Sequence, residues 1–162
     1  MPISTVDYVA FAAPLELAAA QAYQAALDGG TLDAAWTAQA QTFLDHHQDA
    51  VTQLAALIPP SVTEKPNPIP DEDLVRGPVA TAAAAGDQNA ALTVLAGLED
   101  LLTATHLAGL GEIDEQTFAK AVAQVLATES QHVVAIGLAL GTDPATLTPA
   151  QASVDGAAEI PN

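Results

Sequence analysis

The spacing of apolar residues along the chain predicts helices and gives no sign of strands. Apolar side chains recur three, four and seven residues apart, which places them on one face of a helix. β-branched residues are scattered and never form the alternating runs that strands need. Half of the residues are apolar and only 4% are aromatic. Alanine is abundant and is the strongest helix former, so we expect an all-α protein.

Capping and turn residues in the first part of the chain predict one helical hairpin. Ser4 to Asp7 resembles a capping box and opens a helix over residues 5–27. A glycine pair follows and ends that helix. Thr31 can cap a second helix that continues to about residue 58. The turn between the two helices is short, so they should lie antiparallel as neighbours.

The second part of the chain predicts a matching hairpin. A third helix is expected over residues 88–108 and a fourth over about 114–140, with Asp114 as the cap of the fourth. The glycines at positions 109 and 111 break the pattern between them, and Gly141 ends the fourth helix. These two helices should also lie antiparallel.

A proline-rich crossover connects the two hairpins. Five prolines lie within residues 59–70, which predicts an extended segment, and a short helix is expected over 71–85. Two hairpins joined in this way form an antiparallel four-helix bundle, although an up-down bundle with a slack middle loop gives the same order. We therefore expect the bundle to occupy residues 1–142. A tail over 143–162, with one turn after Thr148, should lie along its surface.

Each of the four long helices carries an ionisable residue on its apolar face. The positions three, four and seven residues away from each of them are mostly apolar. A carboxylate buried without a partner costs several kcal/mol, so we expect these side chains to meet. Converging carboxylates repel unless a cation or bound protons offset their charge. The four residues are Glu16, His47, Glu99 and Glu129. By contrast, Asp45 and Asp49 have polar neighbours and belong to a solvated face.

The fourth helix supplies a second metal-ligand type beside its carboxylate. His132 follows Glu129 by three residues, so the imidazole and the carboxylate lie side by side. Oxygen and imidazole ligands together suit iron or manganese. A single Glu-x-x-His pattern is common, and an isolated buried acid or histidine is more often a hydrogen-bonded core residue. The occurrence of such residues on all four helices is what favours a metal site.

The two hairpins repeat the same spacing of polar residues. An acid in the first helix of each hairpin is followed seven residues later by a polar ring, and 30 or 31 residues later by a polar residue of the next helix. The corresponding pairs are Glu16 and Glu99, Tyr23 and His106, His47 and Glu129, and Ala50 and His132. One interpretation is that Tyr23 and His106 simply pack, with their polar ends bonded to a nearby carboxylate. Because Ala50 carries no ligand atom, the second hairpin has a complete half-site and the first does not.

At these residues the sequence resembles the ferritin-like domain family, in particular small, usually exported bacterial members. The resemblance covers about residues 8–142. It is carried by Pro14-Leu15-Glu16, Tyr23, His47-Gln48-Asp49, Leu98-Glu99-Asp100 and Glu129-Ser130-Gln131-His132.

The resemblance implies a ferritin-like bundle with a dinuclear iron or manganese site between its helices. The ligands carried over by position are Glu16, His47, Glu99, Glu129 and His132. Many of these relatives have a histidine where this chain has Ala50, so a degenerate or mononuclear site is an alternative. His46 lies about 100° away around the helix from the position that a replacement ligand would need. The resemblance also implies export, although residues 1–8 show no signal-peptide pattern.

The charge balance and the composition exclude several other functions. Only three basic residues oppose twenty acidic ones, for a formal net charge of -17. Binding to nucleic acid or to an anionic membrane surface needs basic side chains, so neither partner is expected. No stretch is long and apolar enough to cross a bilayer. The chain has no cysteine, which excludes thiol catalysis and zinc–thiolate sites.

The sequence therefore supports two main functions. The first is a metal-binding ferritin-like protein, whether for storage, sequestration or oxygen chemistry, so its status as an enzyme stays open. The second is a non-enzymatic structural or interaction bundle that has lost metal binding. A carrier of an apolar ligand is a third, weaker alternative. Beyond metal ions, the partners to consider are a second copy of the chain and an envelope protein.

Overall fold

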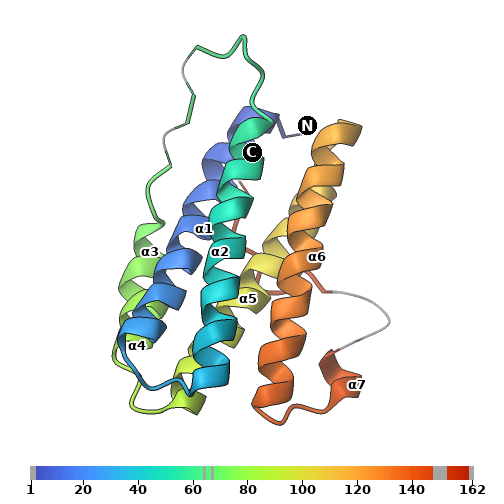
Figure 1. Cartoon of the computed structure of the whole chain (residues 1–162). Coiled ribbons are helices and arrows are strands. Elements are labelled where there is room, and N and C mark those ends of the chain that lie inside the picture. The colour runs from blue at the N-terminus through green and yellow to red at the C-terminus, as the bar shows by residue number, and fades with distance from the viewer. Residues whose placement is uncertain (1–2, 64, 67, 148–152, 161–162) are drawn as a thin grey trace.

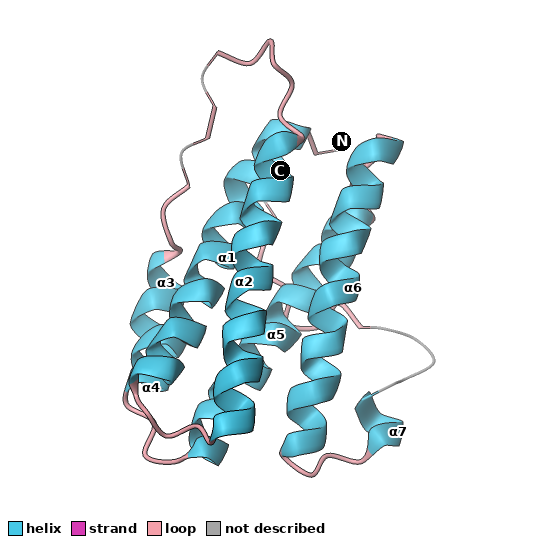
Figure 2. Cartoon of the chain, viewed as in Figure 1, coloured by secondary structure: helices cyan, strands magenta, loops and turns pink. Residues whose placement is uncertain are grey.

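Four long helices run side by side in the computed structural model, as two antiparallel hairpins (Figure 1). The structure describes residues 3–63, 65–66, 68–147 and 153–160. All regular elements in these residues are helical (Figure 2), which confirms the all-α prediction. The long helices are α1 (Thr5–Asp28), α2 (Ala34–Ala56), α5 (Gln88–Leu110) and α6 (Gln116–Ala139). In the described part of the chain, none of the helices combines the length and the hydropathy that a membrane span needs.

The helix starts agree with the sequence prediction at α1 but differ at α2 and α6. The Ser4 hydroxyl accepts the Asp7 backbone N–H at 3.1 Å, as the capping box predicts. The expected caps Thr31 and Asp114 are wrong. Asp33 caps α2 by accepting the Trp36 N–H at 2.8 Å, and Glu115 caps α6 by accepting two backbone N–H groups. At α2 the observed cap is a carboxylate, which the positive end of a helix favours over the neutral hydroxyl of Thr31. At α6 the expected and the observed caps are both carboxylates, and the helix begins one residue later than expected.

The end of α5 also lies later than expected. The helix continues through Gly109 to Leu110 instead of ending near residue 108. Gly109 packs directly against the ring of Tyr8, since a Cβ built there would lie 2.4 Å from Tyr8 Cε2. This glycine therefore allows α5 and Tyr8 to pack closely. The sequence context predicted a helix break at this position, and that prediction is wrong. Gly30 and Gly141 do adopt positive φ values, of 66° and 79°, after α1 and α6.

The crossover returns along the bundle before the second hairpin begins. It leads into three short consecutive elements, α3 (Glu72–Leu74), a π-helical turn η1 (Val75–Val79) and α4 (Ala80–Ala83). These elements lie beside α1 (Figure 1) and bury Leu74 and Ala82. The long crossover thus places α5 beside α1 while each hairpin keeps its own close packing.

The apolar core divides into two clusters, one toward each end of the bundle. One cluster contains Phe43, Leu92 and Leu95. The other contains Leu54 and Phe118. On each long helix, buried polar residues lie at the level where the core passes from one cluster to the other. The buried ionisable residues are Glu16, His47, Glu99, His106, Glu129 and His132.

Two parts of the tail make defined contacts with the bundle. The short helix α7 (Pro144–Leu147) places Leu147 against Gly137 of α6, where a Cβ would lie 2.4 Å from Leu147 Cδ2. Further on, the backbone N–H of Ala158 donates to the Thr105 hydroxyl at 2.8 Å. The turn expected after Thr148 lies outside the described residues.

Candidate metal centre

Two clusters of three buried side chains lie in the middle of the bundle. Within each cluster, one potential ligand atom per residue lies within 4.8 Å of the other two. All six residues are at most 1% exposed. The Glu16 cluster consists of Glu16 from α1, His106 from α5 and Glu129 from α6. The Glu99 cluster consists of His47 from α2, Glu99 from α5 and His132 from α6.

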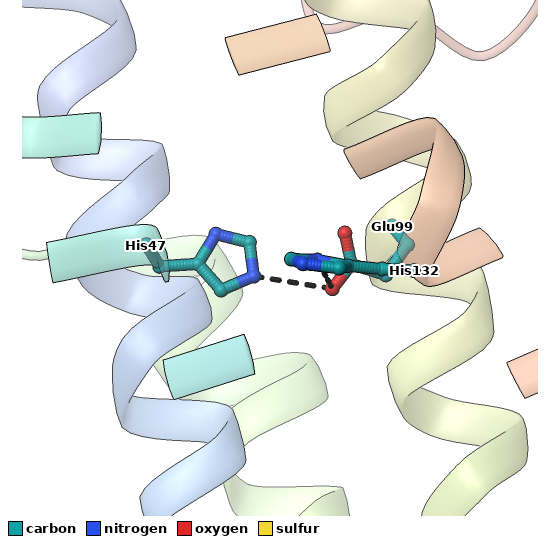
Figure 3. Close-up of side chains that lie close together, drawn as sticks. All are labelled: His47, Glu99 and His132. Atoms are coloured by element: carbon teal, nitrogen blue, oxygen red, sulfur yellow. Dashed lines mark hydrogen bonds and ion pairs between the residues drawn. The ribbon is translucent and has the colours of Figure 1, made fainter. Parts of the chain in front are cut away.

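In the Glu99 cluster, two imidazoles converge on one carboxylate oxygen (Figure 3). His47 Nε2 and His132 Nδ1 each lie 3.1 Å from Glu99 Oε1. The Tyr23 hydroxyl donates a short hydrogen bond to the same oxygen. The other oxygen, Glu99 Oε2, is buried and receives no hydrogen bond from the described residues. One face of this carboxylate is therefore free to bind a cation.

In the Glu16 cluster, one imidazole lies between two carboxylates. His106 Nε2 is 2.6 Å from Glu16 Oε1 and 3.3 Å from Glu129 Oε1. The opposite ring nitrogen, His106 Nδ1, is 2.6 Å from the Tyr8 hydroxyl. Neither oxygen of Glu129 receives a hydrogen bond from the described residues. A buried carboxyl group that lacks such bonds calls for another partner.

His47 joins the two clusters into one network. Its Nδ1 atom lies 2.8 Å from Glu16 Oε2, while its Nε2 atom contacts Glu99. A neutral imidazole has a single N–H, so bonding to two carboxylates favours the doubly protonated ring. The buried carboxylates of different helices thus lie close together, as the sequence predicts, and histidines lie between them.

The charges of the network follow from this pairing. Burial by itself would raise the pKa values of Glu16 and Glu99, but the charges and hydrogen bonds of the neighbouring histidines outweigh it. The pKa of Glu16 lies well below its usual range, and that of Glu99 falls to about 2. For His47 and His106, burial lowers the pKa, yet the neighbouring carboxylates raise it well above its usual range.

The pKa of Glu129 is shifted in the opposite direction to those of Glu16 and Glu99. Burial, together with the charge of Glu16, raises its pKa to about 8 despite the attraction of His106. Without a metal ion, Glu129 is therefore held mainly as a neutral acid at neutral pH. A cation in the cluster would replace this proton and the extra protons of the histidines, since metal ligands bind in their deprotonated forms.

The donor set fits iron or manganese. The Glu16 cluster offers two carboxylates and one imidazole, and the Glu99 cluster offers one carboxylate and two imidazoles. Mixed oxygen and imidazole donors suit these metals, whereas neither cluster offers the thiolates that select softer ones. The carboxylate oxygens without hydrogen bonds supply acceptor capacity that a cation would use.

The structure brings together all five residues that the sequence selected. Their role as ligands remains a prediction. The additional member is His106, which the sequence analysis interpreted as a packing residue. Its signal was already present, because it lies seven residues after Glu99 on the same helix face and corresponds to Tyr23 in the repeat. His106 supplies the Glu16 cluster with the imidazole that Ala50 cannot provide.

Three further positions on α2 behave differently from the ligand candidates. His46 is half-buried, and its Nδ1 atom lies 2.9 Å from His132 Nε2, so it contacts the outer side of a candidate ligand. Asp45 and Asp49 are exposed, as their polar neighbours predict. The polar residues of α2 therefore divide into inward and outward sets according to helical periodicity.

Comparison with known families agrees with the fold and with the site. A family model described as the ferritin-like domain matches residues 4–142. The chain therefore belongs to the ferritin-like domain family, and it has buried His/Glu clusters that could hold a metal ion. No match was found among curated proteins or among solved structures.

Proposed function

We propose that this protein binds iron or manganese between its four long helices, with one ion in each cluster. The observation that carries the proposal is the convergence of two sets of three ligand atoms, each within 4.8 Å, in the buried centre of the bundle. The free oxygens of Glu99 and Glu129 support it, because a cation would use acceptors that no described residue occupies.

The binding of two ions is favoured by the position of His106. The sequence alone predicts a weak first half-site, since Ala50 leaves it without an imidazole. His106 lies 2.6 Å from Glu16 and provides that donor from α5 instead of α2. Each cluster then has three donors that include both a carboxylate and an imidazole, which are donor types that divalent transition metals accept.

When bound, such ions supply Lewis acidity and, in the case of iron, one-electron redox chemistry. The chain itself holds and shields the site. Tyr8 and Tyr23 are buried, and their hydroxyl groups bond to His106 and Glu99. Their hydrogen bonds fix the orientation of one ligand candidate in each cluster, as outer partners do in other metal sites.

The test is equilibrium metal binding to untagged protein, followed by mass spectrometry of the metal content. Metal-free protein dialysed against Mn²⁺, or against Fe²⁺ without oxygen, should retain two equivalents. A single retained equivalent would overturn the two-ion assignment. Less than about a tenth of an equivalent under both conditions would overturn metal binding altogether.

Variants locate the bound ions. The double change Glu129→Ala and His132→Ala removes one ligand candidate from each cluster and should abolish binding. Asp45→Ala removes an exposed carboxylate of α2 and should leave the stoichiometry unchanged. Unchanged binding in the double variant would place the ions on the acidic surface and contradict the proposed site.

The second candidate function is that of a structural or interaction protein that binds no metal, and one observation favours it. Hydrogen bonds between histidines and carboxylates already balance Glu16 and Glu99, so the fold does not need an ion for charge compensation. In that case the network serves stability alone. The same dialysis separates the two functions, because a purely structural network would retain neither metal.

A further inference from the structure

A cavity of about 200 Å³ opens between α2 and α6 beside the two clusters. Two exposed amide side chains, Gln53 and Gln124, border it at the surface. Ala50 lines its wall, and the buried side chains of Glu129 and His132 also line it. An apolar cavity of about 150 Å³ is known to admit a benzene molecule. The volume here is therefore sufficient for a small ring.

In this cavity, the carboxyl oxygens of Glu129 lack hydrogen-bond donors. Its side chain is 2% exposed, and neither carboxyl oxygen receives a hydrogen bond from the described residues. Oε1 makes an ion-pair contact of 3.3 Å with His106 Nε2. Leaving a buried acceptor unpaired destabilises the folded protein. A ligand with an N–H donor would satisfy this group.

The internal repeat indicates the size and shape of the missing group. Ala50 on α2 corresponds to His132 on α6, whose imidazole contacts both Glu99 and His46. Ala50 is 6% exposed and presents only a methyl group to the cavity. The first hairpin therefore has a space where the second hairpin has a five-membered ring with two nitrogens.

The charges around the cavity select the charge of the ligand. The chain has a formal net charge of -17, and Glu16 and Glu129 line the inner part of the cavity. An anion would be repelled by the ionised Glu16 and by the negative charge of the whole chain. The polar groups nearer the surface are neutral, namely the two amides and the hydroxyl of the half-buried Thr128. A neutral donor fits this surface best.

We propose that this cavity binds a small neutral azole, a five-membered ring with one N–H donor and one lone-pair nitrogen. The N–H is directed at the Glu129 carboxyl group, and the lone pair faces the amides and the hydroxyl near the surface. The ligand uses the Glu129 carboxyl group of the candidate metal centre, so it binds the metal-free protein and competes with an ion for this group.

The test is a titration of the metal-free protein with imidazole, followed by NMR. It is carried out at about pH 8.5, where imidazole, with an ordinary pKa near 6.5, is neutral. One molecule should bind with a dissociation constant on the order of 1–10 mM, because a ligand with so few atoms has limited affinity. Intermolecular contacts between imidazole protons and the Ala50 methyl group should be observed. Binding that shows no contact with this methyl group would overturn the proposal.

Variants that fill the cavity provide the second measurement. Ala50→Leu and Thr128→Leu obstruct it from α2 and from α6, and each should weaken imidazole binding at least tenfold. Ala127→Leu adds the same side chain at an exposed position of α6 that does not line the cavity, and it should bind like the wild type. Unchanged affinity in either cavity variant, provided that circular dichroism shows it folded, would contradict the site.

Ligand comparisons test the charge and donor requirements. Acetate, an anion of similar size, and benzene, a ring without a donor, should both bind at least tenfold more weakly than imidazole. Equal binding of benzene would show a merely apolar cavity and would overturn the azole assignment. Since every titration uses metal-free protein, failure of metal binding and failure of this inference are observed in separate experiments.

Discussion

His106 Nε2 on α5 lies 2.6 Å from Glu16 Oε1 on α1. This contact connects the two hairpins through the centre of the bundle, and it assigns His106 to the candidate metal centre. A packing histidine bonded to one carboxylate, as the sequence indicated, accounts for this contact, but the same nitrogen also lies 3.3 Å from Glu129 Oε1. The distinction can be tested with single substitutions.

We expect His106→Leu to weaken binding of one of the two metal ions by more than tenfold and to leave the other in place. The Glu16 cluster loses its only imidazole, whereas the Glu99 cluster keeps all three of its residues. Calorimetric titration with Mn²⁺ should show the change from two binding events to one. Asp49→Ala, an exposed change on α2, is the control. Two unchanged binding events in His106→Leu would show that His106 is a packing residue and does not bind the metal ion.

The metal-free protein should lose stability as pH rises from about 5 to 9. Glu129 has a folded-state pKa of about 8, above the ordinary value near 4.3. Between these values the folded state holds a proton that the unfolded state has lost. Stability then falls with rising pH by up to about 1.4 kcal/mol per pH unit. The raised pKa values of His47 and His106 add to this loss above about pH 6.5.

The lowered pKa values of Glu16 and Glu99 act at the acidic end. Their contribution to stability is present above about pH 4.3 and is lost as pH falls toward their folded-state values. Urea unfolding at several pH values should therefore show a maximum near pH 5. Glu129→Gln should give a shallower decline on the alkaline side, and Asp45→Asn should not. A stability that rises steadily from about pH 5 to 9 would contradict this assignment of protons.

Gly109→Ala should destabilise the protein by about 1–3 kcal/mol, as overpacked cores commonly do. The added Cβ would lie 2.4 Å from Tyr8 Cε2 and 2.8 Å from its hydroxyl oxygen, and Tyr8 is fully buried. The ring must therefore move, which disturbs its hydrogen bond to His106. Urea unfolding measures the cost, and the NMR signals of the His106 ring report the lost bond.

Gly97→Ala is the matched control on the same helix. A Cβ at Gly97 meets no atom within 4 Å. Because alanine favours helices over glycine by up to about 1 kcal/mol, this variant should be stabilised. If both variants gained stability, the contact between Gly109 and Tyr8 would not be a constraint on the fold.

Thr105→Val should release the tail near residue 158 and cost about 1 kcal/mol. The Thr105 hydroxyl accepts the Ala158 N–H at 2.8 Å, and valine keeps the shape but cannot accept this bond. Hydrogen exchange at the Ala158 amide should become faster. Thr103→Val is the comparison, since the buried Thr103 hydroxyl has no hydrogen-bond partner among the described residues. Equal protection of Ala158 in both variants would contradict a role for Thr105 in holding the tail.

Much of the fold could be predicted from the sequence because helix formation depends on local patterns. The apolar periodicity of residues such as Leu95 and Leu102, with the cap at Ser4, was sufficient to place the long helices. Neighbouring caps could not be distinguished, as at Thr31 and Asp33, because both residue types can bond to the start of a helix. In the structure, the carboxylate of Asp33 forms the cap.

For the site, the sequence determined which residues face inward. Glu16, His47, Glu99, Glu129 and His132 follow from helical periodicity alone, and their burial agrees. The tertiary structure decided how these residues are grouped, since distances between helices depend on packing that no local pattern specifies. It placed His106 between two acids, let His47 join the two clusters, and left a cavity beside Ala50. Periodicity thus selected the inward-facing residues, the family resemblance made them ligand candidates, and the packing of the two hairpins gave them their partners.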